Sequence, residues 1–266
     1  MQPPTALRSR LDTLLPAALL VGGSIAFLGG GSRHPQIGSA LGPAGSDAFF
    51  EAFAHKILHV PHWETMHALI LAGPVLWALG AAGAARLIPT RVAALGEVAR
   101  ASLLLAAAAW ALAFILDGFV APVFARPIAA AASPAELHAA ITPFRANQLT
   151  MARLGMISMV LIGGAASAFA ITLLASARRS GWGAIVGATG LAVGVWPIVA
   201  AATGEFAPGP FTSPYWRLTA LATGAWFALL ATALPGNAAV AGQGHLPAIG
   251  APEVGGPESQ HAPSAA

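Results

Sequence analysis

The chain has 266 residues, of which 56% are hydrophobic and only 9% charged, and its formal net charge is +3. Soluble domains carry roughly a quarter charged residues, so the composition excludes a water-soluble domain and predicts a protein solvated by a lipid bilayer. The 13 basic residues are scattered between apolar runs, which argues against a nucleic-acid partner, and the absence of cysteine excludes disulfides, thiolate zinc sites and iron–sulfur clusters.

Residues 1–10 are expected to form a short polar leader on the cytoplasmic side. Six apolar runs follow, and each is long enough to cross a hydrocarbon core of roughly 30 Å as a helix. Strands are excluded because the runs are apolar on all sides and do not alternate. The expected spans are residues 11–30, 63–87, 98–120, 149–177, 182–202 and 217–234. We take the first as an uncleaved span and not a signal peptide, since no small-x-small cleavage site ends it.

The sequence therefore predicts an all-α integral membrane protein with one six-helix transmembrane domain, residues 11–234. The glycines between residues 183 and 194 recur on one face of the fifth span, which indicates close helix packing. In the second outer loop, Ser133 and Glu136 have the spacing of a capping box that starts a short helix. Residues 235–266 are rich in Gly, Pro and Ala without apolar periodicity, so we expect a disordered cytoplasmic tail.

Arginine and lysine in the loops predict the orientation, because cytoplasmic loops are enriched in both. With the N-terminus inside, the inner loops are short and basic, and both termini are cytoplasmic. The preference for Arg over Lys and the abundance of Ala indicate a GC-rich bacterial genome, and hence the bacterial cytoplasmic membrane. In this orientation the basic residues on the cytoplasmic side are Arg8, Arg10, Arg86, Arg91, Arg100, Arg178 and Arg179. Those on the outer side are Arg33, Lys56, Arg126, Arg145 and Arg217.

The first outer loop is expected to contain a helix, residues 47–59, that lies on the outer membrane surface. Ser46 is suited to cap its start. The apolar residues of this segment gather on one face, which is typical of helices that lie in the interface. Glu51, His55 and His59 recur at i, i+4 and i+8 on another face.

Ionisable residues within the spans predict a polar pocket. A charged group at the centre of a span costs roughly 2.5–3.5 kcal/mol on insertion scales, so each one needs a reason. Under the predicted orientation these residues share the outer half of the bundle. The candidate ligand-binding residues are His67, Asp117, Arg153, Glu205 and Arg217. The structural alternative is that Asp117 and Arg153 form an ion pair, while Arg153 and Arg217 reach lipid headgroups.

Metal binding is one hypothesis for this pocket. Glu64 and His67 lie one turn apart, a spacing that di-iron bundles use, and His55 and His59 have an i, i+4 spacing that suits zinc or copper. The candidate metal ligands are therefore His67, Glu64, His55 and His59, for copper, zinc or iron. A haem b held by two histidines has less support, because it needs histidines deep in two helices and His67 alone lies inside an expected span.

The sequence thus favours a multi-pass inner-membrane protein whose outward-facing pocket binds a metal ion or a small ligand, as a subunit of a redox or transport complex. A second hypothesis is a proton-coupled transporter of a small solute that uses the same residues. A third is a structural subunit with no site of its own. The expected partners are lipid and either another membrane protein or a second copy of the chain. The chain holds no Gly-x-Ser-x-Gly and no P-loop, so neither of these motifs points to an enzyme. Whether the chain is an enzyme stays open.

Overall fold

The computed structural model describes residues 5–35, 43, 45–88, 92–176, 181–203 and 214–243. Within these residues the chain is helical and has no strand, which confirms the predicted all-α class. The helices are α1 Thr5–Arg33, α2 Asp47–His59, α3 Trp63–Ala84, α4 Ala93–Ile115, α5 Ala121–Ala130, α6 Pro134–Ser176, α7 Gly181–Ala202 and α8 Pro214–Gln243. A π-helical segment, Leu116–Val120, joins α4 to α5.

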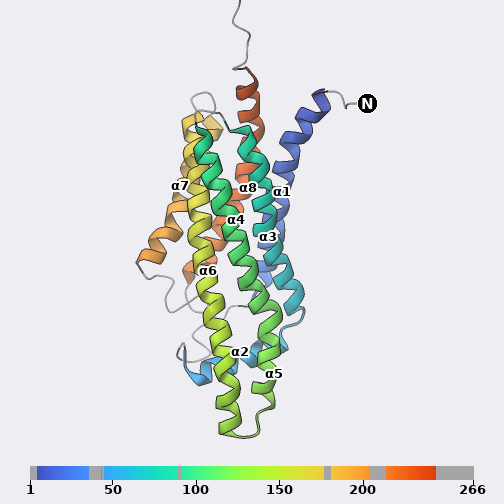
Figure 1. Ribbon diagram of the computed structural model, residues 1–266, viewed down its shortest axis with the longest axis vertical. Helices are drawn as coiled ribbons and strands as arrows, with labels where there is room; N and C mark the ends of the chain where they lie inside the picture. The colour runs from blue at the N-terminus through green and yellow to red at the C-terminus, as the bar shows by residue number, and fades with distance from the viewer. Residues whose placement is uncertain are drawn as a thin grey trace, which may run out of the picture.

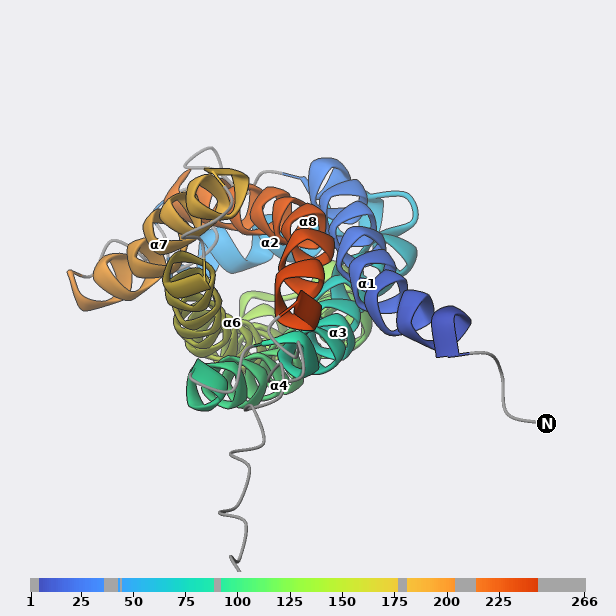
Figure 2. The same cartoon turned by 90° about the horizontal axis from the view of Figure 1, so that it is seen from above.

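Among the described residues, six helical segments are long and apolar enough to cross a membrane, as the sequence predicts. These segments are α1, α3, α4 continued by α5, α6, α7 and α8. Seen from above, they form a closed ring in the order α1, α3, α4, α6, α7, α8, and α8 packs against α1 (Figure 2). The start of α1 and the end of α8 lie at one end of this ring. Helix α2 and the α5–α6 connection lie at the other, which we call the α2 end (Figure 1).

The third and fourth helical segments are longer than the spans expected at residues 98–120 and 149–177. The third continues through the π-helical segment into α5 and ends at Ala130, and α6 begins at Pro134. With 43 residues, α6 is about 65 Å long, roughly twice the thickness of a hydrocarbon core. The α5–α6 pair therefore extends well beyond the other helices at the α2 end (Figure 1).

The capping box expected at Ser133 and Glu136 forms. Ser133 Oγ accepts a hydrogen bond from the Glu136 amide at 3.3 Å, and Glu136 Oε2 accepts one from the Ala132 amide at 2.8 Å. It starts α6 itself and not a separate short helix, because the helix continues from Pro134 through the apolar span to Ser176.

Helix α2 lies across the α2 end of the bundle and packs on α5 and α6 (Figure 1). The expected N-cap is present, since Ser46 Oγ accepts a hydrogen bond from the Phe49 amide at 3.1 Å. Phe49, Phe50 and Phe53 are buried. The ring of Phe144 on α6 meets those of Phe50 and Phe53 at centroid distances of 6.2 and 5.8 Å. The apolar face that the sequence assigns to the lipid surface is therefore largely covered by protein.

Asp47 ties the first turn of α2 to α6. Its carboxylate accepts hydrogen bonds from His138 Nδ1, at 3.2 Å, and from the Arg145 guanidinium, which also lies 5.1 Å from the centroid of the Phe50 ring. The hydrogen bond from His138 holds the pKa of Asp47 below its usual value, and Arg145 acts in the same direction. This carboxylate is therefore ionised in the folded protein even in weak acid.

We expect the contribution of Asp47 to stability to depend on pH. A carboxyl group whose pKa is lower in the folded than in the unfolded state stabilises the fold at pH values above its unfolded pKa of roughly 3.9. This stabilisation disappears as the pH falls through the pKa of the folded state. The midpoint of thermal unfolding in detergent should therefore be higher for the wild type than for Asp47→Asn at pH 7, and the difference between the two should be smaller at pH 3. Glu51→Gln, on the same helix but in none of the described ion pairs, is the control. An equally large Asp47→Asn difference at both pH values would contradict this role.

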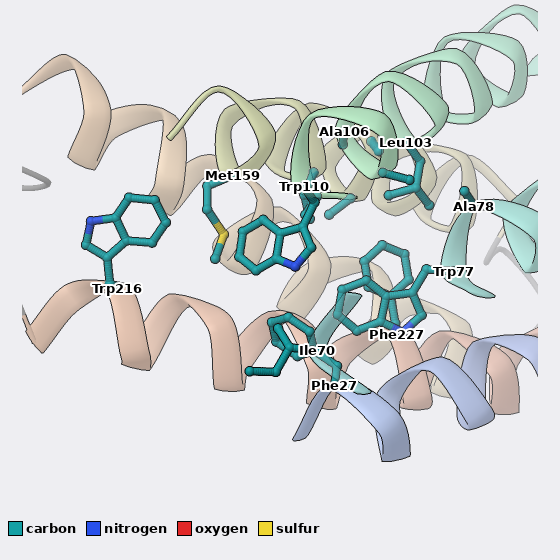
Figure 3. Packing of buried hydrophobic residues seen from close by; sticks show 14 of the residues in the cluster. Phe27, Ile70, Trp77, Ala78, Leu103, Ala106, Trp110, Met159, Trp216 and Phe227 are labelled. Atoms are coloured by element: carbon teal, nitrogen blue, oxygen red, sulfur yellow. The ribbon is translucent and has the colours of Figure 1, made fainter. Parts of the chain in front are cut away.

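Aromatic rings fill the interior of the ring of helices (Figure 3). The rings of Phe27 on α1 and Trp110 on α4 lie 5.7 Å apart across the interior. Trp77 on α3 lies 4.9 Å from Phe27 and stacks on Phe227 of α8 at 4.7 Å. These contacts fix the register of α1, α3 and α4 relative to one another. Closer to the α2 end, polar side chains lie on α3 and directly after the ends of α1 and α4.

The glycine face of α7 packs against its neighbours, as the sequence indicates. A Cβ atom at Gly190 would lie 2.5 Å from the Trp226 ring of α8, and one at Gly194 would lie 2.7 Å from the Gly163 carbonyl of α6. At the chain ends, α1 starts at Thr5, within the expected leader, and α8 continues past the expected last span to Gln243. The remainder of the expected tail, residues 244–266, lies outside the described residues.

Candidate metal centre

His67 and Asp117 meet at the interface between α3 and the end of α4. His67 lies one turn inside α3 and is completely buried, and the Asp117 side chain is 5% exposed. His67 Nε2 lies 3.0 Å from Asp117 Oδ2. The structure thus brings together two of the residues that the sequence places at one depth.

His34, directly after α1, completes the cluster. Its Nε2 lies 3.7 Å from the same Asp117 Oδ2, and its ring centroid is 5.1 Å from that of His67. One atom from each of the three side chains lies within 4.8 Å of the others, and this is the one such group of three among the described residues. The His34 side chain is 26% exposed, whereas the side chains of His67 and Asp117 are buried.

Both imidazoles are oriented by backbone carbonyls. His67 Nδ1 lies 2.7 Å from the Trp63 carbonyl, one turn earlier on α3, and His34 Nδ1 lies 3.1 Å from the Pro35 carbonyl. A carbonyl oxygen only accepts, so each Nδ1 carries the proton. In the neutral rings each Nε2 then has a lone pair, and both Nε2 atoms lie next to the Asp117 carboxylate.

These lone pairs create an electrostatic conflict inside an apolar bundle. An ionised carboxylate oxygen also only accepts, so three acceptors converge within 4.8 Å. Asp117 Oδ1 is buried as well, without a hydrogen-bond partner among the described residues. Buried acceptors without partners are costly. A metal cation between the three atoms would resolve this conflict, and so would protons on the imidazoles or on the carboxyl group.

The π-helical segment presents Asp117 to the two histidines. In a π-helix the backbone hydrogen bonds shift to i→i+5, and single π turns are frequent at functional sites. Side chains from two neighbouring helices bind the carbonyls of this segment. Trp63 Nε1 donates to the Asp117 carbonyl at 2.9 Å, and Asn147 Nδ2 donates to the Leu116 carbonyl at 3.1 Å. Helices α3 and α6 therefore hold the wide turn in place.

Gly118 allows the close approach of α3 to this segment. A Cβ atom at this position would lie 2.4 Å from the Cβ of His67, far inside van der Waals contact. Aromatic rings enclose the rest of the histidine, since the rings of Trp63 and Phe114 lie 4.3 and 5.6 Å from it. The imidazole of His67 is thus fixed in position as well as in tautomer.

The other predicted ligand-binding residues do not join this cluster. The side chain of Arg153 is exposed, and the ion pairs of Asp117 in the described part of the chain are with His34 and His67 instead. The expected Asp117–Arg153 pair is therefore not formed. Arg217 is exposed, and Glu205 lies outside the described residues.

The other predicted metal ligands also lie apart from it. Glu64, one turn before His67, is exposed and does not belong to the buried group of His34, His67 and Asp117. His59 Nδ1 lies 2.7 Å from the His55 carbonyl, and the two ring centroids are 6.5 Å apart on the surface of α2. Within the described residues, no third ligand joins this pair.

Sequence reasoning missed His34, because it lies beyond the expected end of the first span at residue 30. The helix in fact continues to Arg33, which places His34 seven residues after Phe27 and at the level of Asp117. The same spacing occurs twice in the sequence: His34 follows Phe27 by seven residues, and Asp117 follows Trp110 by seven residues. In the structure Phe27 pairs with Trp110 and His34 pairs with Asp117, so this shared spacing was the available signal.

No protein-family model, no curated protein and no solved structure matches this chain.

Proposed function

We propose that this chain is a multi-pass protein of the bacterial cytoplasmic membrane that holds one divalent transition-metal ion at His34, His67 and Asp117. The observation that carries the proposal is the convergence of two imidazole lone pairs on one carboxylate oxygen. A divalent cation resolves this conflict with both rings neutral. The second NH group of each ring donates to a carbonyl, which is the usual support of a metal-bound histidine.

The separations of the ligand atoms support this assignment. In a tetrahedral zinc site, bonds of about 2.0–2.1 Å place neighbouring ligand atoms roughly 3.3 Å apart. The separations from Asp117 Oδ2 to the two Nε2 atoms, 3.0 and 3.7 Å, lie on either side of that value, and all three ligand atoms lie within 4.8 Å of one another. Two imidazoles and one carboxylate are used by catalytic zinc and by non-haem iron(II). The set contains no sulfur ligand, which argues against copper(I).

Three protein ligands leave a coordination position open, which is the pattern of reactive and not of structural zinc sites. The partial exposure of His34 supports access to this position from the α2 end. The site thus fits binding or conversion of a small molecule at the outer membrane surface, with α2 at the same level.

Reconstitution with cobalt(II) tests the proposed function. Protein purified in detergent and stripped with chelator should bind one Co²⁺ per chain and develop visible d–d absorption, and Zn²⁺ should remove the colour by competition. His34→Ala and His67→Ala should each abolish the band. His138→Ala, which removes an imidazole at the α2 end outside the cluster, is the control. A wild type without stoichiometric cobalt binding would refute the proposal.

The proposed orientation places the metal site outside the cytoplasm, and the single lysine of the chain, Lys56, gives a direct test. Because Lys56 is on α2, we expect a membrane-impermeant amine reagent to label it in right-side-out spheroplasts, as identified by peptide mapping. Inverted vesicles prepared from the same cells are the control. Labelling of Lys56 in inverted vesicles alone would reverse the orientation.

A proton-carrying site is the second candidate, and the same lone-pair conflict favours it, because protons on both Nε2 atoms would also resolve it. A relay of two imidazoles and a carboxylate in a membrane bundle is typical of proton pathways. The two candidates differ in the metal content of the purified protein and in the change of thermal stability that Asp117→Asn causes.

A further inference from the structure

Gln148 on α6 has an unusual environment for an amide in an apolar bundle. Its side chain is completely buried, and neither Oε1 nor Nε2 has a hydrogen-bond partner among the described residues. Each unpaired buried polar group costs roughly 1–3 kcal/mol, and buried polar groups in folded proteins are almost always paired. Both ends of this amide are therefore available to a molecule that is not part of the chain.

The register of α6 places Gln148 on the face directed to the interior of the ring of helices. Residues four before and seven after it share that face. Phe144 packs on α2 at one end of the bundle, and a Cβ atom at Gly155 would lie 3.1 Å from the Trp216 ring of α8. Gln148 lies between these two contacts, beneath α2.

The same turn of α6 is held at the level of the metal site. Asn147, the preceding residue, donates its hydrogen bond to the Leu116 carbonyl, next to Asp117. Asp117, in the π-helical segment that follows α4, has an Oδ1 atom that is likewise buried and without a hydrogen-bond partner among the described residues. Two such polar groups, one in this segment and one on α6, thus lie at one level of the bundle.

The charge of the proposed site determines what can bind there. A divalent cation with two neutral imidazoles and one carboxylate carries a net charge of +1. In the low dielectric of the bundle, a single charge is strongly unfavourable without a counter-ion. The exposed side chains of Arg153 and Arg217 are positive and do not compensate it. The open coordination position therefore favours a small anion.

We propose that the open position of the metal binds a small oxyanion of the carboxylate class, and that the Gln148 amide donates a hydrogen bond to the oxygen that the metal does not bind. This inference rests on the metal site proposed above and names the ligand that the site takes. The amide would also make the site prefer an oxyanion to chloride, because a chloride ion bound to the metal has no second atom to accept the hydrogen bond from Gln148.

Formate binding to the Co²⁺-loaded protein tests this inference. We expect sodium formate to shift the d–d band with saturation, and at a lower concentration than sodium chloride at equal ionic strength. Gln148→Leu should keep one Co²⁺ per chain and weaken the formate Kd by about tenfold or more, as expected for a lost hydrogen bond to a charged group. Arg153→Gln, an exposed charge on the same helix, should leave the formate Kd unchanged within about twofold.

The possible outcomes separate the two proposals. Cobalt bound without any response to formate overturns the oxyanion site and leaves the metal site standing, and a lack of cobalt binding overturns both. An unchanged formate Kd in Gln148→Leu, or a loss of formate binding in Arg153→Gln, overturns the role of Gln148. If Gln148→Leu loses cobalt as well, Gln148→Asn decides, since a weaker formate Kd with cobalt retained supports the contact and an unchanged one refutes it.

Discussion

Asp117→Asn is expected to lower the affinity for Co²⁺ by at least about 100-fold while the fold stays intact. Loss of a group that merely supports a ligand costs 10–100-fold in metal affinity, and Asp117 is the sole anionic ligand of the proposed site. The asparagine has nearly the same shape, and its Nδ2 can donate to the Nε2 lone pair of His67. The metal-free variant should therefore unfold at the same temperature as the metal-free wild type or above it.

The sign of this stability change distinguishes a metal site from a structural ion pair. If Asp117 instead balanced protonated imidazoles, Asp117→Asn would leave a buried charge unpaired, which costs roughly 3–5 kcal/mol. Thermal unfolding of metal-free wild type and variant in the same detergent measures the difference. A variant that unfolds well below the wild type would favour the proton-carrying alternative. Glu51→Gln, which removes a carboxylate on α2 that is in none of the described ion pairs, controls for loss of charge.

Gly118→Ala is expected to have the second largest effect, because the two Cβ atoms that would clash are both fixed to backbone. A Cβ at residue 118 would lie 2.4 Å from that of His67, and no rotamer change can relieve this contact. Helix α3 must then move away from the π-helical segment and separate His67 from Asp117. Overpacking of this kind costs about 1–3 kcal/mol or more, and we expect cobalt affinity to fall by about tenfold or more.

Gly164→Ala on α6 is the matched control, since a Cβ there would meet nothing within 4 Å. Alanine is favoured over glycine within a helix by up to about 1 kcal/mol, so this variant should keep its cobalt affinity and unfold at the same or a higher temperature. Cobalt titration and thermal unfolding of both variants check the pair. Equal behaviour of Gly118→Ala and Gly164→Ala would contradict the tight contact between α3 and the π-helical segment.

Hydropathy alone predicted the all-α class and six long apolar helices, because length and lack of charge are local properties of the sequence. It missed the extension of α4 into α5 and the start of α6 at Pro134. These segments are held by packing between α2, α5 and α6, as in the contact of Phe144 with Phe50. Such contacts join residues far apart in the chain, and no window of sequence contains them.

The candidate site was predictable in part for the same reason. His67 and Asp117 were identified because a polar residue in an apolar span is conspicuous. His34 was missed because it follows the span, and Arg153 was included because depth predicts the level of a side chain but not its direction. Gln148 carries no charge, so its unpaired amide is visible only when its surroundings are known.

The central claim is that this bundle holds a metal ion, and elemental analysis of the protein as isolated tests it most directly. Wild type and Asp117→Asn should be purified side by side in detergent without chelator and measured by inductively coupled plasma mass spectrometry. We predict about one equivalent of zinc or iron per wild-type chain and a trace in the variant. A wild type without stoichiometric metal, or equal metal in both proteins, would contradict the account.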